Sequence, residues 1–246
     1  MDILDNVMSK HHVILVPGLM CDATVWAHQA RQLETTATTI AISDHGSIDA
    51  LGKMAEAILK SAPERFAIAG HSMGGRVALE VFRLAPDRIE GMALMDTAYG
   101  PRPAGALGEA EAAQRYTLLD IARTEGTRAM GKVWVQNMVH PDRLADTALL
   151  NSILDMFSRK TRDVFAAQIK ALLERPDATP LLTEIQCPTM VLCGRQDAWS
   201  TLSRHKEIAA RIEQSKLVVI EDSGHMSTME RPEQVTAAMY AWLTSL

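Results

Sequence analysis

The sequence of 246 residues predicts an α/β protein, with a mostly parallel sheet of about six strands flanked by helices. Short apolar runs alternate along the chain with segments of helical periodicity, which is typical of parallel strands joined by crossover helices. This alternation stops over a long central stretch and resumes before the C-terminus. The pattern therefore indicates one α/β core that carries a helical insertion.

The strands are expected where apolar or β-branched residues form short continuous runs, as they do in buried parallel sheets. Pro17-Gly18 stops the first run, so a loop should follow it. In chain order, the predicted strands cover residues 13–16, 38–42, 66–69, 89–95, 189–193 and 216–220.

Helices are predicted between the strands from apolar residues spaced three and four apart. Asp22 is suited to cap the first helix, which should run to about Leu33. Ser47 or Asp49 is expected to begin the second, whose apolar face includes Ile48. Further helices are predicted over residues 76–84, about 201–212 and 232–246.

The central stretch, from about Tyr99 to Thr183, has helical periodicity and no strand signal. We therefore predict a core formed by residues 1–98 and 184–246, with residues 99–183 as the helical insertion. Pro101-Arg102-Pro103 and Arg175-Pro176 are suited to act as hinges at the two ends of this insertion.

Charge and composition argue against several classes of partner. The net charge is −5 and no run of Lys or Arg occurs, so neither nucleic acid nor a membrane surface is an expected partner. The three cysteines form no disulfide framework, and no apolar run approaches the roughly 18 residues that span a bilayer. We expect a cytoplasmic monomer or homodimer.

The most informative stretch is Gly70-His71-Ser72-Met73-Gly74, between a predicted strand and a predicted helix. A serine flanked by glycines on such a turn has the pattern of a nucleophile elbow, in which the hydroxyl stands above the edge of the sheet. Ser72 is therefore the candidate nucleophile. His71 should point away from the site, because neighbouring side chains of a strand alternate in direction.

A serine nucleophile needs a base and a carboxylate that orients the base. In the fold that carries such an elbow, the chain order is Ser, then Asp or Glu, then His. Asp197 and His225 follow the last two predicted strands in that order. Asp222 and Asp96 are weaker candidates for the carboxylate.

The candidate oxyanion hole consists of the backbone N–H groups of Met73 and Leu19, the second of which lies in the loop after the first strand. The N–H group of Met20 is the less favoured alternative to Leu19. The predicted substrate-binding residues lie beside these positions or could face them from the insertion; they are Gly18, Met20, Trp134, Trp199 and Met226. No cluster has metal-ligand spacing, so neither a metal nor another cofactor is expected.

Four segments together make the chain similar to the α/β-hydrolase superfamily, in particular to its small bacterial esterases. They are Val-Pro-Gly-Leu-Met, Gly-His-Ser-Met-Gly-Gly, Gly-Arg-Gln-Asp and Ser-Gly-His-Met. The resemblance implies the α/β-hydrolase fold, with the insertion of residues 99–183 as a helical cap. The sequence departs from the family at Pro17-Gly18, where relatives usually have His-Gly.

The expected function is that of a serine hydrolase acting on a carboxylic ester of a small, largely apolar substrate. The same catalytic groups could instead cleave a carbon–carbon bond in a diketone, a lactone or a thioester, because fold and triad do not choose among these reactions. Cationic groups in the cavity would favour a carboxylated diketone; candidates in the insertion are Arg102, Arg115 and Arg128. A small-molecule receptor without turnover is a further, less favoured hypothesis.

Overall fold

The structure is a computed structural model that describes residues 11–34, 37–40 and 44–246. The described residues form a sheet of six strands in the order β2-β1-β3-β4-β5-β6, and every pairing is parallel. The strands are β1 His11–Val16, β2 Ala37–Ile40, β3 Phe66–His71, β4 Ile89–Met95, β5 Thr189–Gly194 and β6 Ser215–Ile220. The predicted fold class is confirmed, and residues 41 and 42 of the second predicted strand lie outside the described residues.

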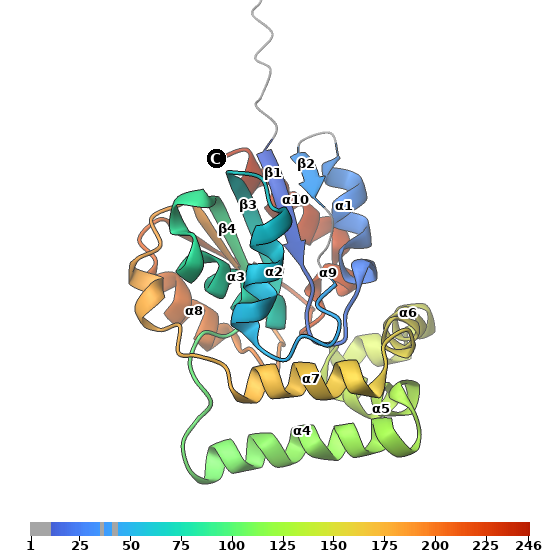
Figure 1. The fold of residues 1–246 in the computed structure, drawn as a ribbon. Coiled ribbons are helices and arrows are strands. Elements are labelled where there is room, and N and C mark those ends of the chain that lie inside the picture. The colour runs from blue at the N-terminus through green and yellow to red at the C-terminus, as the bar shows by residue number, and fades with distance from the viewer. Residues whose placement is uncertain (1–10, 35–36, 41–43) are drawn as a thin grey trace, which may run out of the picture.

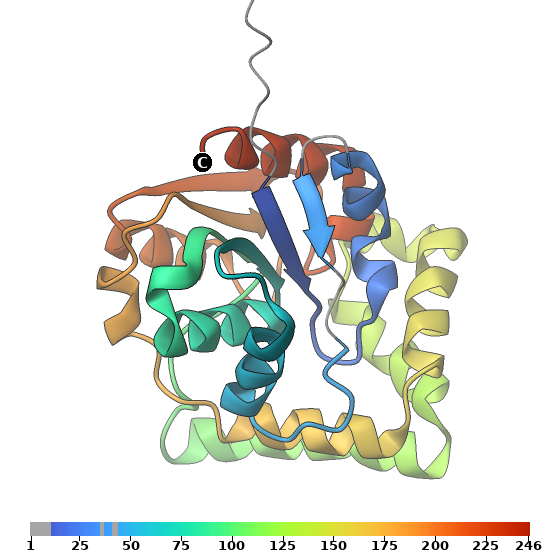
Figure 2. The same cartoon turned by 45° about the horizontal axis from the view of Figure 1, so that its top comes forward.

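Helices cover both faces of the sheet, as expected for parallel strands joined by crossovers. Helix α1 packs against α10 on one face, and α2 packs against α3 on the other (Figures 1 and 2). The core helices are α1 Ala27–Leu33, α2 Leu51–Ser61, α3 Met73–Leu84, α8 Leu202–Arg211, α9 Ser227–Glu230 and α10 Pro232–Leu243.

The first helices begin differently from the prediction. Asp22 does act as a cap, accepting a hydrogen bond from the Thr24 N–H, but the residues it caps form a short 3-10 turn before α1. Helix α2 begins at Leu51 rather than near Ser47 or Asp49. The Asp49 carboxylate accepts hydrogen bonds from lysine side chains instead of capping this helix.

The segment between β4 and β5 contains helices and no strand, as the periodicity predicts. Its helices are α4 Ala106–Thr124, α5 Thr127–Trp134, α6 Thr147–Ser158 and α7 Arg162–Leu173. Figure 1 shows α4, α5 and α7 below the sheet, where β1 and β3 end. The two connections to the core lie together, because Arg175 donates hydrogen bonds to the carbonyls of Gly100 and Pro101. The boundaries of the cap stay a prediction.

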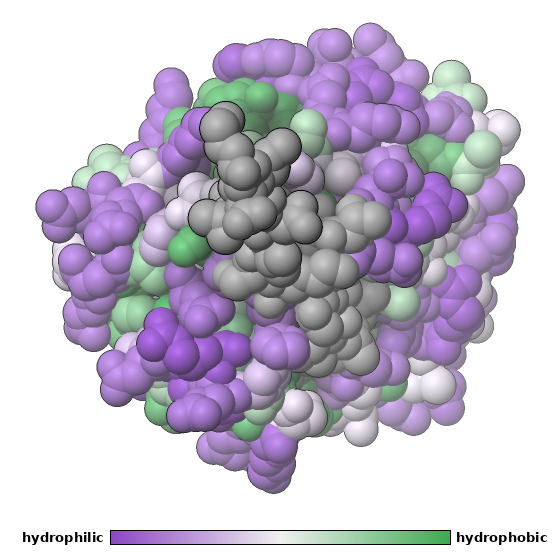
Figure 3. Space-filling model, turned by 90° about the horizontal axis from the view of Figure 1, so that it is seen from above, coloured by the Kyte–Doolittle hydropathy of each residue, from purple (hydrophilic) through white to green (hydrophobic). Residues whose placement is uncertain are grey.

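The coloured residues that Figure 3 shows at the end of the molecule opposite the cap are mostly hydrophilic, with apolar residues in separate small patches. Within the described ranges, no helix is both long enough and apolar enough to cross a membrane. The cytoplasmic location and the oligomeric state stay predictions.

Candidate active site

Ser72 stands on the sharp turn between β3 and α3, with φ of 56° and ψ of −118°. Few residues other than glycine adopt such angles, and they are typically found where the surrounding structure enforces them. The flanking glycines allow the turn to close. A Cβ atom at Gly70 would lie 2.3 Å from the carbonyl oxygen of Gly74, and one at Gly74 would lie 2.1 Å from that of Val16.

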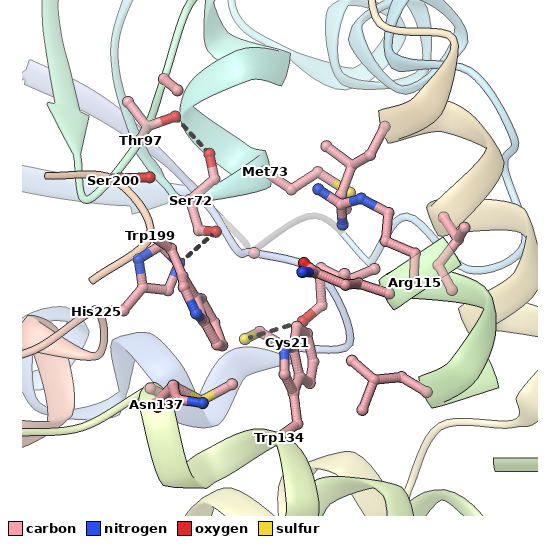
Figure 4. A pocket seen from close by; sticks show the side chains of 18 of the residues that line it. Cys21, Ser72, Met73, Thr97, Arg115, Trp134, Asn137, Trp199, Ser200 and His225 are labelled. Atoms are coloured by element: carbon pink, nitrogen blue, oxygen red, sulfur yellow. Dashed lines mark hydrogen bonds between the residues drawn. The ribbon is translucent and has the colours of Figure 1, made fainter. Parts of the chain in front are cut away.

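Three side chains that are far apart in the sequence form a continuous series of hydrogen bonds, of which Figure 4 shows the one between Ser72 and His225. The Nε2 atom of His225 lies 2.8 Å from the Oγ atom of Ser72, and its Nδ1 atom lies 2.7 Å from Oδ2 of Asp197. The second carboxylate oxygen of Asp197 accepts hydrogen bonds from the N–H groups of Trp199 and Ser200, both at 2.8 Å. The carboxylate is therefore held in one orientation toward the imidazole.

The environment of this pair favours its ionised form. Burial alone would raise the pKa of Asp197, but the neighbouring His225 and the two N–H donors lower it. Burial alone would also lower the pKa of His225, but the charge and the hydrogen bond of Asp197 raise it. A proton taken up by this imidazole is thus stabilised by Asp197.

The rival carboxylates have other partners than the His225 ring. Asp222 is exposed and its nearest ionic partner is Arg231, at 3.9 Å. Asp96 is fully buried and accepts hydrogen bonds from the Gly194 N–H and the Ser227 hydroxyl. Neither forms a hydrogen bond with His225 in the described part of the chain.

Asp96, Cys193 and Asp197 have ligand atoms within 4.8 Å of one another, which the spacing in the sequence did not reveal. Their oxygens already accept the hydrogen bonds described above, and burial raises the pKa of the Cys193 thiol. These groups are therefore committed to the protein's own structure. The expectation of no metal stays a prediction.

Two backbone N–H groups are available beside Ser72. Met73 is the first residue of α3, where N–H groups have no acceptor within the helix. Leu19 lies in the loop after β1, whose residue Gly18 approaches Ser72 closely. The Met20 N–H donates to the side chain of Gln168 at 2.9 Å, so it is not free for a ligand.

A cavity of about 610 Å³ lies beside Ser72, between the core and the inserted helices (Figure 4). Trp134 of α5 stacks on Trp199 with ring centroids 5.5 Å apart, and Trp199 packs 4.9 Å from the His225 ring. Gly18 and Met226 also line this cavity, as does Cys21. The substrate-binding prediction for Met20 is wrong in its placement, because this side chain is fully buried and does not line the cavity.

His71 also departs from the prediction. It lines the cavity rather than pointing away from it, and its Nε2–H group donates to the backbone carbonyl of His225 at 2.7 Å. Alternation along β3 failed as a guide here because the next residue already leaves the strand at the turn. Burial lowers the pKa of His71 to about 3, so the ring is neutral at ordinary pH.

Sequence reasoning missed several residues around the site. Glu230 is buried and accepts hydrogen bonds from three backbone N–H groups, those of His140, Gly224 and Met226. Gln168 reaches from α7 to the loop after β1. Arginines from four segments line the cavity. Of the three predicted candidates, Arg115 lines it, whereas Arg102 and Arg128 do not. Arg76 could have been found, because it lies one helical turn after Ser72.

A sequence model of the alpha/beta hydrolase family matches residues 13–238, so the chain belongs to this family. The chain is 28% identical to the dihydrolipoyllysine-residue acetyltransferase component of an acetoin cleaving system from Pseudomonas putida, over 94% of this chain but only 63% of that protein. It is 24% identical to a pimeloyl-[acyl-carrier protein] methyl ester esterase from Aromatoleum aromaticum, over 92% of this chain and 95% of that one. A solved esterase from Thermogutta terrifontis superposes with a TM-score of 0.83 and 28% identity, covering 96% of this chain and 90% of that one.

Proposed function

We propose that the protein is a serine hydrolase that cleaves a carboxylic ester through an acyl-enzyme on Ser72. The observation that carries this proposal is the series of hydrogen bonds from Asp197 through His225 to the Ser72 hydroxyl, which borders the cavity. The family itself and the esterase names of two similar proteins support an ester as the substrate.

In this mechanism, His225 accepts the proton of Ser72 as the serine oxygen attacks the ester carbonyl. The N–H groups of Met73 and Leu19 hold the oxyanion; losing one such donor typically costs ~10²–10³ in rate. His225 then protonates the leaving alcohol and afterwards activates the water that releases the acid. Asp197 orients the imidazole and stabilises its charge throughout.

The first test is hydrolysis of p-nitrophenyl esters, from acetate to octanoate. Ser72→Ala should lose almost all turnover, retaining at most the ~10³–10⁴ over water that binding and an oxyanion hole supply. Ser203→Ala is the matched control, because Ser203 is exposed on α8 and does not line the cavity. Undiminished turnover by Ser72→Ala would refute the mechanism.

A covalent probe separates a hydrolase from a receptor that kept the fold. A fluorophosphonate should modify the wild-type protein once and leave Ser72→Ala unmodified, since only an activated serine reacts rapidly. The mass of the intact protein measures this. Equal modification of both proteins would place the reactive nucleophile elsewhere.

Cleavage of a carbon–carbon bond in a carboxylated diketone is the second candidate. The arginines that line the cavity favour it, because they match the carboxylate of such a substrate. Loss of a diketone's absorbance without activity on any ester would support this reaction. Lactone and thioester substrates extend the same assay.

A further inference from the structure

The cavity beside Ser72 is lined by more positively than negatively charged side chains, which come from both the core and the inserted segment. Its lining contains a single carboxylate, that of Glu111, among the residues that the structure describes. It also contains four guanidinium groups, which we call the arginine cluster: Arg76, Arg115, Arg175 and Arg204. The protein thus surrounds part of its cavity with three more positive than negative charges.

Glu111 neutralises only part of this charge. Arg175 binds its two oxygens at 2.7 and 2.8 Å, and Arg115 binds one of them at 2.9 and 3.1 Å. Both oxygens of the Glu111 carboxylate therefore already accept hydrogen bonds, from Arg115 of α4 and from Arg175 in the segment after α7.

Among the described residues, Arg76 is the half-buried member of the cluster without a carboxylate partner; Arg204, which also has none, is exposed. Within the described residues, the Arg76 guanidinium donates a single hydrogen bond, to the Gly100 carbonyl at 2.9 Å. Burial, and then the nearby charge of Arg175, lowers the pKa of Arg76 to about 9, which still leaves it protonated at neutral pH. A half-buried cation with no carboxylate partner is costly unless a ligand supplies the negative charge.

The arginine cluster and Ser72 belong to one cavity. Arg76 lies four residues after Ser72, one turn into α3, and therefore on a similar side of this helix. In Figure 4, His225 and Trp199 lie on one side of Ser72 and Arg115 on the other. The stacked rings of Trp134 and Trp199 line the same cavity. The apolar chain of a substrate can therefore extend from Ser72 to the arginine cluster.

From this arrangement, and resting on the proposed function, we infer that the substrate carries a free carboxylate at the end remote from the scissile bond. The arginine cluster binds this carboxylate while Ser72 attacks the ester. Guanidinium groups suit the role, because their planar forks match the two oxygens of a carboxylate. The substrate class is that of monoesters of short dicarboxylic acids, rather than neutral esters.

The experiment compares monomethyl adipate with dimethyl adipate, which differ only in the methyl group that blocks the remote carboxylate. Wild-type protein should prefer the monoester in kcat/KM. Arg115→Gln should reduce this preference about tenfold or more, chiefly through KM, because a hydrogen bond between two charged groups is lost. Arg115→Lys should restore part of it. The series from monomethyl succinate to monomethyl suberate then measures the distance between the two ends.

Arg123→Gln is the matched control, because Arg123 lies on the same helix but is exposed and does not line the cavity. It should leave the preference unchanged. A wild-type preference for the diester, or a preference for the monoester that Arg115→Gln and Arg76→Gln leave intact, would overturn the inference while leaving the esterase proposal standing.

Binding of adipate itself separates this inference from the proposed function. Calorimetry with Ser72→Ala needs no turnover: adipate should bind, and the additional Arg115→Gln change should weaken its affinity about tenfold or more. If neither ester is cleaved but adipate binds in this way, the esterase proposal fails and the carboxylate site stands. If adipate does not bind, the carboxylate site is refuted.

Discussion

Ser72 has a backbone conformation that most residues avoid, and this conformation gives its hydroxyl the position from which His225 can reach it. The Nε2 atom of His225 lies 2.8 Å from the hydroxyl oxygen, and the Nδ1 atom of the same ring lies 2.7 Å from Oδ2 of Asp197. Each of these contacts joins a side chain to a different loop. The hydrogen bonds among Ser72, His225 and Asp197 therefore depend on the backbone dihedral angles of single loop residues as much as on the sheet that carries the loops.

At this residue scale, the raised pKa of His225 predicts the shape of the pH profile. The base in the proposed reaction is the neutral imidazole, so kcat/KM should rise with pH as the ring loses its proton. Burial would lower the pKa, but Asp197 raises it above the ordinary 6.5. The midpoint of the rise should therefore lie above pH 6.5.

Asp197→Asn tests the cause of that shift. Without the carboxylate, burial is left to lower the pKa of His225, so the midpoint should move to lower pH. The maximal rate should also fall, by up to about 10⁴-fold, because the imidazole is held in the wrong tautomer and its charge is no longer stabilised. Asp222→Asn, at the exposed rival position, should alter neither quantity. An unshifted midpoint in Asp197→Asn would contradict this account.

At the scale of elements, the short helix α9 fastens the loop that carries His225. Glu230 of α9 accepts the N–H groups on both sides of His225 and that of His140 in the cap. His225 is also tied through its own backbone, because its N–H donates to the Met138 carbonyl at 2.7 Å. One buried carboxylate therefore joins the catalytic loop to the inserted segment.

Glu230→Ala should lower the free energy of unfolding by roughly 2–4 kcal/mol, because three N–H groups in a closely packed region lose their acceptor. Urea unfolding measures this. Glu233→Ala, on the exposed first turn of α10, should change the free energy by no more than about 0.5 kcal/mol. Equal losses in the two variants would show that the buried hydrogen bonds of Glu230 contribute nothing of their own.

At the scale of the whole molecule, an ion pair at the cavity joins Glu111 of the cap to Arg175, which lies in the segment that connects the cap to the core. Burial would raise the pKa of Glu111, but the hydrogen bond of Arg175 and the charge of Arg115 lower it to about 2, from an ordinary value of 4.5. A depressed pKa in the folded state contributes stability that is fully present above pH 4.5 and is lost as the pH falls toward 2.

The wild-type Tm should therefore fall more steeply between pH 4.5 and about pH 2 than that of Glu111→Gln, which has no carboxylate to protonate. Glu109→Gln is the control, because Glu109 is exposed on the same helix. Parallel pH curves for wild type and Glu111→Gln would mean that this ion cluster does not contribute to acid stability.

The sequence alone was enough to predict the strands of the sheet and to predict that Ser72, Asp197 and His225 lie close together. Each strand is a short apolar run, and parallel strands bring their carboxyl ends to one edge. Residues that directly follow β3, β5 and β6 must therefore meet there, however distant they are in the chain. The predicted catalytic roles of these residues await the experiments described above.

The charge of the cavity and the fastening of its loops were decided by the tertiary structure. The four residues of the arginine cluster come from α3, from α4, from α8 and from the segment that follows α7. Helical periodicity identifies the apolar face of each helix, but it does not say against which other element that face packs. The same limit explains Met20, His71 and Glu230, whose places follow from turns and from packing between distant segments. A local pattern fixes where a strand ends, whereas the side chains that surround a cavity depend on how helices that are remote in sequence pack together.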